Sequence, residues 1–265
     1  MNMSKLDLQL FNQQPTQAQL GWGTLVQRHD GEEYVSILEV QSISGPALDA
    51  DDVDVTNMMS PGGYQESIAG LKTAGEISFN GNLIPRNATH QKMIELQKSG
   101  LREPWRIVIP DAQDIEERTK IVFLGYIKSC GMEFPTASQM TYSATIQIVG
   151  EPTMAVDYSA DLTGLEIDSY TNASGDEGEV SETLDPIFDG ETYGYEVSVD
   201  NSQVSCRVTP TGAADSLYVN EMPVDTTQAS HPIQLDVGLN TIYVRSQDNE
   251  LLPRYYGIKV TRAES

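Results

Sequence analysis

The sequence contains few side chains whose type and spacing could support catalysis or metal binding. The three histidines, His29, His90 and His231, stand far apart, and none lies at a metal-ligand or triad spacing from another histidine or a cysteine. We therefore expect them at the surface or on the flank of a helix. Cys130 and Cys206 fall in different predicted domains, so we expect no disulfide framework, which suits a reducing compartment.

Acidic residues cluster where a calcium site could be suspected, at Asp49, Asp51, Asp52 and Asp54. The cluster lacks the glycine at the sixth position and the glutamate at the twelfth that a calcium-binding loop of this type requires. We therefore expect a solvated strand end instead of a cation site.

The sequence Pro61–Gly63 could suggest a phosphate-binding loop. No Gly-Lys-Ser or Gly-Lys-Thr follows it and its surroundings are acidic, so the pattern predicts a turn. No Gly-x-Ser-x-Gly motif occurs and no pair of carboxylates stands out. We expect no enzyme, no cofactor and no metal. A glycan hydrolase is the enzymatic alternative, and it would need paired carboxylates assembled at a cleft from distant residues.

Composition limits the classes of partner. The chain has 265 residues, enough for two ordinary domains or one large β domain, and its net charge is −23. Acid spread along the whole chain argues against binding to nucleic acid or to an anionic membrane, because both are gripped by clustered Lys and Arg. The N-terminus lacks a signal-peptide pattern and no apolar run approaches the roughly eighteen residues of a membrane span, so we expect no membrane insertion.

The elements predicted for the first half are mostly strands. Residues 1–20, rich in Gln and Asn, indicate an arm that is ordered only by a neighbour. Alternating apolar residues predict strands at Tyr34–Ile43 and Glu76–Phe79, and Asn80-Gly81 after the second strand is a hairpin signal.

One helix is predicted at Thr89–Ser99, where apolar residues recur with helical spacing. Asn87 or Thr89 can cap its start, and Gly100 stops it. The sequence places these residues on its apolar stripe or at the stripe's edge: Met93, Ile94, Leu96 and Leu101.

Three further strands are predicted at Trp105–Ile109, Lys120–Ile127 and Met140–Ile148. The second is apolar on both faces, which is typical of a central strand or of one pressed against another subunit. The third alternates strictly, which predicts one buried and one wet face, and Gly150-Glu151-Pro152 is expected to end it.

A long polar connection runs from Asp51 to Ala74 with only isolated apolar side chains. Such a segment suits folding on a partner surface, whereas an enzyme lid would need a site beneath it. A flexible surface loop is the alternative. The isolated apolar side chains are Met58, Met59, Tyr64, Ile68 and Leu71.

Beyond residue 158 the alternation is shorter and more regular, and it predicts an antiparallel β sandwich of seven strands. The division leaves 11 basic and 20 acidic residues before it and 5 basic and 19 acidic residues after it, so the second part is the more acidic. The strands are expected around Leu165–Ile167, Tyr193–Val199, Val204–Val208, Leu217–Val219, Ile233–Val237, Ile242–Val244 and Tyr256–Val260.

Five sequence features occur in order across residues 21–152: SISGP, DVDVT, GGYQESIAGL, GEISFNGN and IVGEP. Together they resemble the tail tube protein of long-tailed, lambda-like bacteriophages. The resemblance implies a β-sandwich or barrel with one flanking helix, whose subunits form six-fold rings that stack into a hollow tube. It also implies a tape measure protein and tail tip or terminator proteins as partners, and DNA that passes through the lumen without specific binding.

The resemblance further implies that the connection from Asp51 to Ala74 and the N-terminal arm reach from one ring to the next. An acidic lumen would let DNA pass without sticking, with Glu39, Glu76 and Glu133 as candidates. The residues expected at the contact between rings or subunits are Thr56, Met58, Met59, Gly62, Gly63, Tyr64, Ile68, Gly70 and Leu71.

The second half resembles cadherin-like β-sandwich modules of bacterial and phage proteins. The similarity rests on LDPIFDGETYGYEVSV, PIQLDVGLNTIYV and YYGIKVTR, and it covers about a hundred residues. The insertion Asp168–Glu182 is longer and more acidic than the pattern, and the calcium-binding Asp motifs are missing, so no calcium is implied. Such a domain would hang outside a tube as decoration.

The sequence thus predicts a mainly β chain in three parts: an arm at 1–20, a tail tube domain at 21–158 and an Ig-like, cadherin-like β sandwich at 159–265. The predicted function is a structural virion protein of the tail, assembled in the host cytoplasm into stacked hexameric rings through which DNA is ejected. The alternative is an adhesin-like tail accessory whose sandwich binds a glycan.

Overall fold

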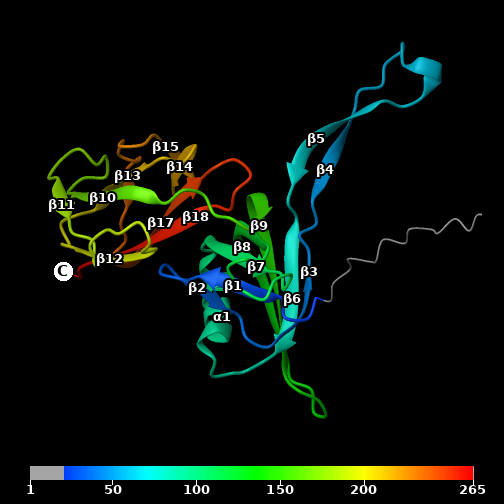
Figure 1. Ribbon diagram of the computed structural model, residues 1–265, viewed down its shortest axis with the longest axis horizontal. Coiled ribbons are helices and arrows are strands. Elements are labelled where there is room, and N and C mark those ends of the chain that lie inside the picture. Colours follow the sequence, from blue (N-terminus) through cyan, green and yellow to red (C-terminus); the bar gives the residue numbers. More distant parts are fainter. Residues whose placement is uncertain (1–20, 265) are drawn as a thin grey trace, which may run out of the picture.

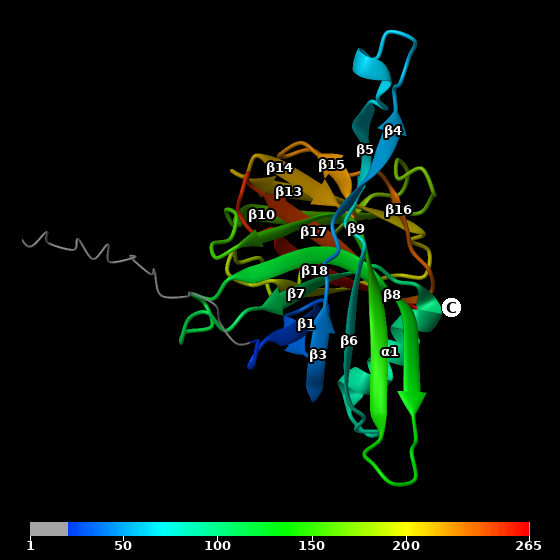
Figure 2. The ribbon, with the colours of Figure 1, turned by 90° about the vertical axis from the view of Figure 1, so that its right-hand side faces the viewer.

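The computed structural model describes residues 21–264, so the predicted arm at 1–20 lies outside the described residues. The chain is mainly β, as predicted, and its strands form four sheets. One seven-stranded sheet comes from residues 25–155, two smaller sheets come from residues 162–262, and a two-stranded ribbon projects from the first sheet (Figures 1 and 2).

The seven-stranded sheet is antiparallel throughout, in the order β2-β1-β7-β8-β9-β6-β3. The two long strands β8 and β9 lie at its centre and pair with each other along most of their length. The bounds are β1 Leu25–His29, β2 Tyr34–Ser36, β3 Val40–Ser44, β6 Glu76–Asn82, β7 Glu103–Val108, β8 Lys120–Glu133 and β9 Thr141–Ala155.

The core of this part follows from the alternation of its strands. Ile77 and Phe79 of β6 and Tyr142 and Ile146 of β9 are at most 3% exposed, while Ser78, Ser143 and Thr145 on the alternate positions face outward. The predicted two-faced pattern of β9 is thereby confirmed. Burying such side chains is the main stabilising contribution to the fold.

The single helix of the described residues, α1 (Ala88–Ser99), covers this core. The Asn87 side chain caps it by accepting hydrogen bonds from the backbone N–H groups of Thr89 and His90, and Gly100 ends it in the left-handed conformation, as predicted. His90, Met93 and Leu96 are buried. The expectation that Leu101 shares this face is wrong, because the chain turns at Gly100 and leaves Leu101 exposed.

Two histidine positions also differ from expectation. His29 and His90 are each only 1% exposed, whereas His231 lies at the surface. The Nδ1 atom of His90 accepts a hydrogen bond from the Ile84 backbone, and its Nε2 atom is bonded to the Leu38 carbonyl. Because both ring nitrogens have partners, the ring can be buried without a catalytic or metal-binding role.

The predicted strand at Tyr34–Ile43 is interrupted. It divides into β2 and β3 at residues 37–39, where Ile37 turns into the core and Glu39 has a φ of 60°. The Leu38 carbonyl between them accepts a hydrogen bond from the Tyr142 hydroxyl. Tertiary contacts at the break therefore outweigh the local alternation.

Asn80-Gly81 does not form the predicted hairpin turn. Both residues lie inside β6 and pair with β3 on one side and β9 on the other. A Cβ atom on Gly81 would lie 2.1 Å from the Glu39 carbonyl oxygen. Glycine is needed here for close approach of two backbones, a role that the dipeptide alone does not distinguish from a turn.

The predicted end of β9 at residues 150–152 is also wrong. The strand continues to Ala155 and pairs again with the start of β8. Gly150 has a φ of 81°, and the register shifts between Val122 and Leu124. Gly150 and Pro152 therefore mark an irregularity inside a strand. The same residue types also mark turns, so the sequence alone does not distinguish the two.

The second part is a sandwich of two sheets, with strand orders β11-β10-β13-β16 and β12-β18-β17-β14-β15. All seven predicted strands are present, and β11 and β15 are additional. Tyr195, Val208, Ile242 and Tyr256 are at most 1% exposed and lie in its core. The bounds are β10 Leu162–Tyr170, β11 Val180–Glu182, β12 Gly194–Val199, β13 Ser205–Gly212, β14 Ser216–Val219, β15 Met222–Val224, β16 Ile233–Gln234, β17 Gly238–Gln247 and β18 Arg254–Arg262.

The expectation of a purely antiparallel sandwich is wrong at one pair, because β12 runs parallel to β18. The chain enters β12 from β11 of the opposite sheet, so the pair is not joined by a hairpin. The insertion Asp168–Glu182 is ordered by pairing of β11 with the end of β10.

Candidate assembly surfaces

The segment between Asp51 and Ala74 is not a plain loop. Its flanks form an antiparallel ribbon of β4 (Asp49–Asp54) and β5 (Ser67–Thr73), which stands clear of the seven-stranded sheet (Figures 1 and 2). Neither strand contains a buried residue. Two-stranded ribbons of this kind are marginally stable alone, so the ribbon is suited to a contact that covers it.

The tip of the ribbon, residues 55–66, holds its shape through its own polar groups. The Ser60 hydroxyl donates to the Glu66 carboxylate at 2.7 Å, and the Glu66 backbone donates to the Thr56 hydroxyl at 2.9 Å. Pro61–Gly63 forms a 3₁₀ turn in which Gly62 and Gly63 have φ values of 66° and 73°, which confirms the predicted turn.

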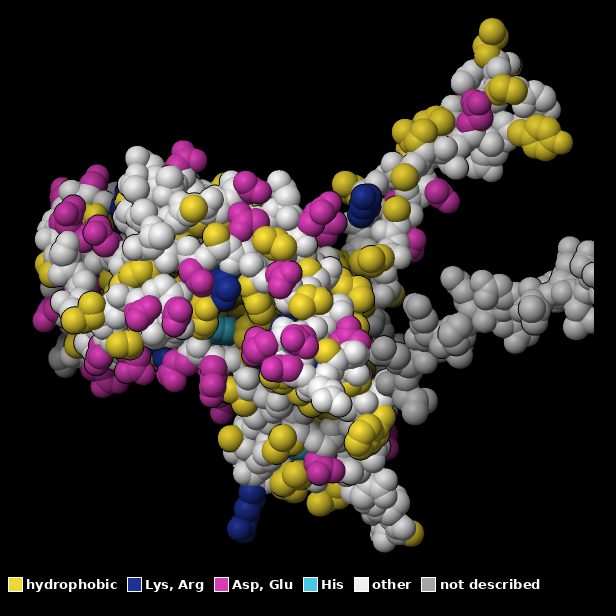
Figure 3. Space-filling view, in the orientation of Figure 1, with side chains coloured by type: hydrophobic (Ala, Val, Ile, Leu, Met, Phe, Trp, Pro, Cys, Tyr) yellow, Lys and Arg dark blue, Asp and Glu magenta, His cyan; other side chains and the backbone are white. Residues whose placement is uncertain are grey.

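The apolar side chains of the ribbon point away from the molecule. Met58, Met59 and Tyr64 at the tip are 103%, 88% and 78% exposed, and Ile68 and Leu71 on β5 are 56% and 83% exposed. Figure 3 shows these hydrophobic side chains spread along the projecting arm. Exposed apolar clusters of this kind mark protein–protein contacts in soluble proteins.

The remaining residues expected at the contact have structural positions within the same ribbon. A Cβ atom on Gly70 would lie 2.8 Å from Val53 and 3.0 Å from the Asp51 carbonyl, next to the register shift of β4. The ribbon thus brings together all nine predicted contact residues, and none of them is buried in the chain as described. Their contacts with other subunits remain a prediction.

Three strand edges of the seven-stranded sheet are unpaired within residues 21–264, and one of them is the outer edge of β2, which pairs with β1 alone. Pairing of β7 with β8 stops at Gly125, so residues 126–133 of β8 have β9 as their only partner. At the other end of the sheet, β3 is paired with β6 alone. Sequence periodicity did not reveal these edges, because it shows which face of a strand is buried but not which neighbours it has.

The lower half of the sheet is therefore a four-stranded unit, β3-β6-β9-β8, with a free edge on each side. Because neighbouring strands alternate in direction, β3 and β8 run antiparallel to each other. If two copies lie side by side, the β3 edge of one copy can continue the β8 edge of the next as an antiparallel ladder.

The outer face of this unit is lined by small polar side chains. Ser78 and Thr145 share a hydrogen bond of 3.1 Å, Ser42 donates to Asn80 at 3.0 Å, and the Gln41 amide donates to Asn82 at 2.8 Å. These side chains lie opposite the buried residues of the same strands. The face is thus wet and built largely of hydroxyls and amides.

Of the three acids suggested for a lumen wall, Glu76 alone has a cationic partner within residues 21–264. Glu76 forms an ion pair with Lys128, and Glu39 accepts a hydrogen bond from Asn82 at 2.9 Å. Glu133 is exposed and pairs across the ladder with Thr141.

The two parts of the chain meet at a tight junction. A Cβ atom on Gly257 of β18 would lie 2.2 Å from the Gly31 carbonyl oxygen in the β1–β2 turn, so the two backbones are in contact there. Lys259 forms an ion pair with Glu32 across the junction. Val122 of β8 and Tyr255 of β18 belong to one small apolar cluster and are 0% and 5% exposed.

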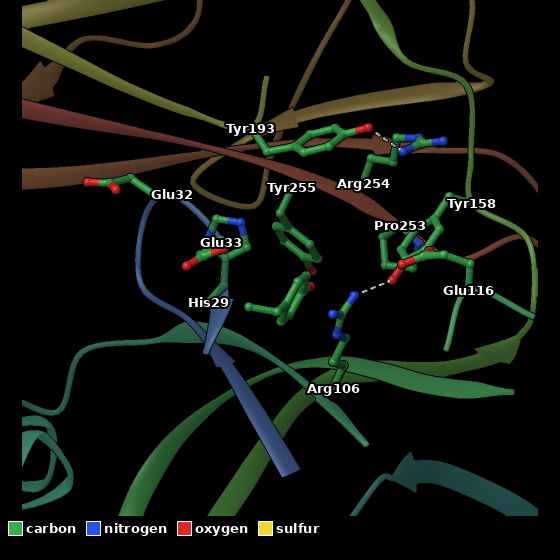
Figure 4. A pocket seen from close by; sticks show the side chains of 11 residues that line it. His29, Glu32, Glu33, Arg106, Glu116, Tyr158, Tyr193, Pro253, Arg254 and Tyr255 are labelled. Carbon is green, nitrogen blue, oxygen red and sulfur yellow. Dashed lines mark hydrogen bonds between the residues drawn. The ribbon is translucent and has the colours of Figure 1, made fainter. Parts of the chain in front are cut away.

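A cavity of about 340 Å³ opens at this junction, lined by side chains from both parts (Figure 4). Its two arginines already have partners: Arg106 donates to the Tyr158 hydroxyl at 2.8 Å, and Arg254 donates to the Tyr193 hydroxyl at 2.6 Å. The first bond ties the seven-stranded sheet to the segment that leads into the sandwich, and the second lies within the sandwich, where Arg254 also forms an ion pair with Asp161.

Two titratable groups of the first part are buried, and one of them, His29, lines the cavity. Burial lowers the pKa of His29 to about 4, and the ring accepts a hydrogen bond from the Gly31 backbone at 3.1 Å. Burial also raises the pKa of Glu103, although its ion pair with Arg28 at 3.0 Å opposes that rise. Both effects follow from the low polarity of the junction.

Candidate sites for other chemistry are not supported in the described part of the chain. Among residues 21–264, no group of three His, Cys, Asp or Glu side chains is placed to hold a metal ion, and Asp49–Asp54 form an exposed strand. No helix within this described part is long and apolar enough to cross a membrane.

Two family models match the chain. Residues 24–155 match lambda phage tail tube protein, and residues 137–263 match the cadherin-like beta sandwich domain. The matches overlap at residues 137–155, most of which lie in β9 of the seven-stranded sheet. A relative in Pseudomonas phage PAJU2, "Structural protein 3", is 25% identical over 131 residues, which cover 43% of this chain and 79% of the relative.

Solved structures with some similarity come from tail-like particles. A chain in the virion of a native gene transfer agent is 20% identical, with a TM-score of 0.43 over 52% of this chain and 99% of that chain. The SPP1 tail tube is 11% identical, with a TM-score of 0.40 over 51% of this chain and 76% of that chain. At these TM-scores the overlaps support no argument by themselves.

Proposed function

Because the chain belongs through residues 24–155 to the lambda phage tail tube family and carries a cadherin-like β-sandwich domain after it, we propose that it is the subunit of a hollow tube of hexameric rings through which DNA is ejected. Its role is structural and its place is the virion tail. The tail tube domain would span residues 21–158 and the sandwich residues 159–265.

The observation that carries this proposal is the pair of free strand edges on the unit β3-β6-β9-β8. Each edge exposes backbone N–H and C=O groups that invite pairing with another chain. Because the edges run antiparallel, neighbouring copies can join β3 to residues 126–133 of β8 all round a ring. Closure of the ring leaves neither of these two edges open, which lowers the risk of uncontrolled aggregation.

The polar face of the same unit then becomes the wall of the lumen. DNA is retained by cationic side chains that neutralise its phosphates, and the Lys128 ammonium on this unit has the Glu76 carboxylate beside it, so the pair carries no net positive charge. Hydroxyls and amides such as those of Thr145 and Asn80 hold water without attracting phosphate. A wall of this kind lets DNA pass without specific binding.

The sandwich would lie outside such a tube as decoration. Figure 1 shows it on the side of the molecule away from β3 and β6, so it lies clear of the β3 edge. The ribbon would contact the next ring, and the remaining partners would be a tape measure protein and tail tip or terminator proteins. Assembly would take place in the host cytoplasm.

Negative-stain electron microscopy of the purified full chain tests this proposal. Hollow rods with regular striations are expected, from the chain alone or after addition of a tail-tip nucleus. A chain that stays monomeric at high concentration and also in the presence of the nucleus would contradict the proposal.

A further inference from the structure

One short segment of this acidic chain is basic. Residues 84–102 carry four of the 16 Lys and Arg residues and a single acid, Glu95, although the whole chain has a net charge of −23. The segment consists of α1 and the residues on either side of it. Its four cations are Arg86, Lys92, Lys98 and Arg102.

Most of this positive charge is unpaired. Arg86, Lys98 and Arg102 are exposed, and none of the three forms an ion pair within residues 21–264. Lys92 bonds to Glu95 of the same helix at 3.1 Å, and both side chains are at least 44% exposed. An exposed pair of this kind contributes little stability, so both groups are free to exchange partners.

The ribbon has the opposite character. Residues 49–73 contain Asp49, Asp51, Asp52, Asp54 and Glu66 but one lysine, Lys72. No ion pair within the described residues neutralises these carboxylates. The ribbon therefore presents unpaired negative charge together with the exposed apolar side chains of its tip.

These two surfaces cannot meet within one subunit. In both ribbon views the tip of β4 and β5 extends from one end of the molecule, while α1 lies beside the lower half of the seven-stranded sheet toward the other end (Figures 1 and 2). A copy displaced along the direction of the ribbon brings its α1 toward the ribbon of the first copy. Such a head-to-tail contact uses two different patches and repeats without limit, as stacking requires.

We propose that the acidic ribbon of one copy docks along the exposed face of α1 of a second copy, with Asp51 and Asp52 opposite the cations of residues 84–102. This inference rests on the proposed function and names the receptor surface for the ribbon. Opposite charge fixes partner and register, while the apolar tip contributes buried area. Ile84, 39% exposed beside Arg86, offers an apolar counterpart for the tip.

Charge reversal on each side, alone and together, tests the docking. The ribbon variant is Asp51→Lys with Asp52→Lys, and the helix variant is Arg86→Glu with Lys98→Glu. Each variant alone is expected to lower the pelleted tube fraction at least about fivefold, because like charges then face each other. The chain that combines all four substitutions restores opposite charge and is expected to recover most of the tubes.

Glu166→Lys with Glu191→Lys is the matched control, since both acids are exposed on the sandwich and the change in net charge equals that of the ribbon variant. This control should assemble normally. Circular dichroism and gel filtration of every variant establish that the subunit is folded, which surface substitutions of this kind should leave unchanged.

Carbodiimide crosslinking of unaltered tubes gives a second reading, because the reagent joins carboxylates directly to nearby amines. Links from Asp51 or Asp52 to Lys92 or Lys98 of another copy are expected in tubes and absent from monomers. Crosslinks from the ribbon to a different surface would overturn the docking but not tube formation. The same conclusion would follow if the chain with all four substitutions formed as few tubes as each double variant. Failure of the unaltered chain to form tubes, both alone and with a tail-tip nucleus, would instead refute the proposed function.

Discussion

At three positions the fold depends on one particular type of residue. Asn87 supplies the oxygen that starts α1, Gly81 lets β6 approach the backbone at Glu39, and Gly257 lets the sandwich contact the β1–β2 turn. The cap was predictable because its partners are two and three residues away. The two glycine contacts were not, because each depends on a backbone that is distant in sequence.

The cap of α1 can be tested by substitution. Asn87→Ala should lower the free energy of unfolding by about 1 kcal/mol, because two backbone N–H groups of the helix lose their acceptor. Thermal unfolding measures the loss. Asn87→Asp keeps the acceptor and should behave as the unaltered chain. Equal losses in both variants would show that the side chain contributes by packing instead.

Burial of His29 predicts a dependence of stability on pH. The pKa of His29 is lowered from 6.5 to about 4, so the folded chain binds fewer protons than the unfolded chain between these values. Stability is therefore full above about pH 6.5 and falls as the pH decreases to about 4, with a loss on the order of 3 kcal/mol from this group.

Urea unfolding at several pH values measures this slope. The pKa of His29 also depends on four nearby charges, those of Asp30, Arg28, Arg106 and Lys259. The unaltered chain must therefore be compared with a variant that lacks only the histidine. His29→Gln removes the titrating group and should flatten the curve between pH 6.5 and 4. An unchanged slope in this variant would assign the pH dependence to other groups.

The glycine contact at the junction predicts that Gly257→Ala separates the two parts of the chain. The added Cβ atom would clash with the Gly31 backbone, which cannot move as a flexible side chain would. Limited proteolysis should cut the variant faster near residue 158. Gly21→Ala, where a Cβ atom meets nothing within 4 Å, is the control. Equal resistance of both variants would contradict a rigid junction.

At the scale of elements, the sequence predicts best where burial repeats along one strand or helix. The alternation at Met140–Ile148, the helix at Thr89–Ser99 and the seven sandwich strands are all found in the structure. For the ribbon the sequence predicts only a solvated strand end at Asp49–Asp54, where β4 is found. The strand β5 is missed because it buries no face, so no periodic apolar signal marks it. The candidate contact residues were nevertheless found, since isolated apolar side chains in a polar segment remain visible in the sequence.

The ribbon tip gives a prediction at this scale. Replacing residues 58–64 with a short Gly-Ser linker should leave thermal stability unchanged, because no side chain of the ribbon is buried in the described subunit. Stacking should be lost, since Met58, Met59 and Tyr64 are removed. Sedimentation and negative-stain microscopy report tube formation. Tubes of ordinary length from this variant would exclude the tip from the contact between rings.

At the scale of the whole molecule, three surfaces have separate tasks. The free edges of β3 and β8 would join neighbours in a ring, the ribbon and α1 would join successive rings, and the sandwich would face outward. The acidic lumen expected from net charge stays a prediction, and much of the chain's acid lies on the ribbon and the sandwich. Composition gives total charge, and only the fold shows where that charge is placed.

The most direct test of this account is a cryo-electron microscopy map of the assembled chain at a resolution that traces strands. The account predicts a closed inner barrel in which β3 of each copy pairs antiparallel with residues 126–133 of β8 in the next, with Ser78 and Thr145 facing the lumen and the sandwich outside. A tube in which these two edges stay unpaired, or in which the sandwich lines the channel, would contradict it.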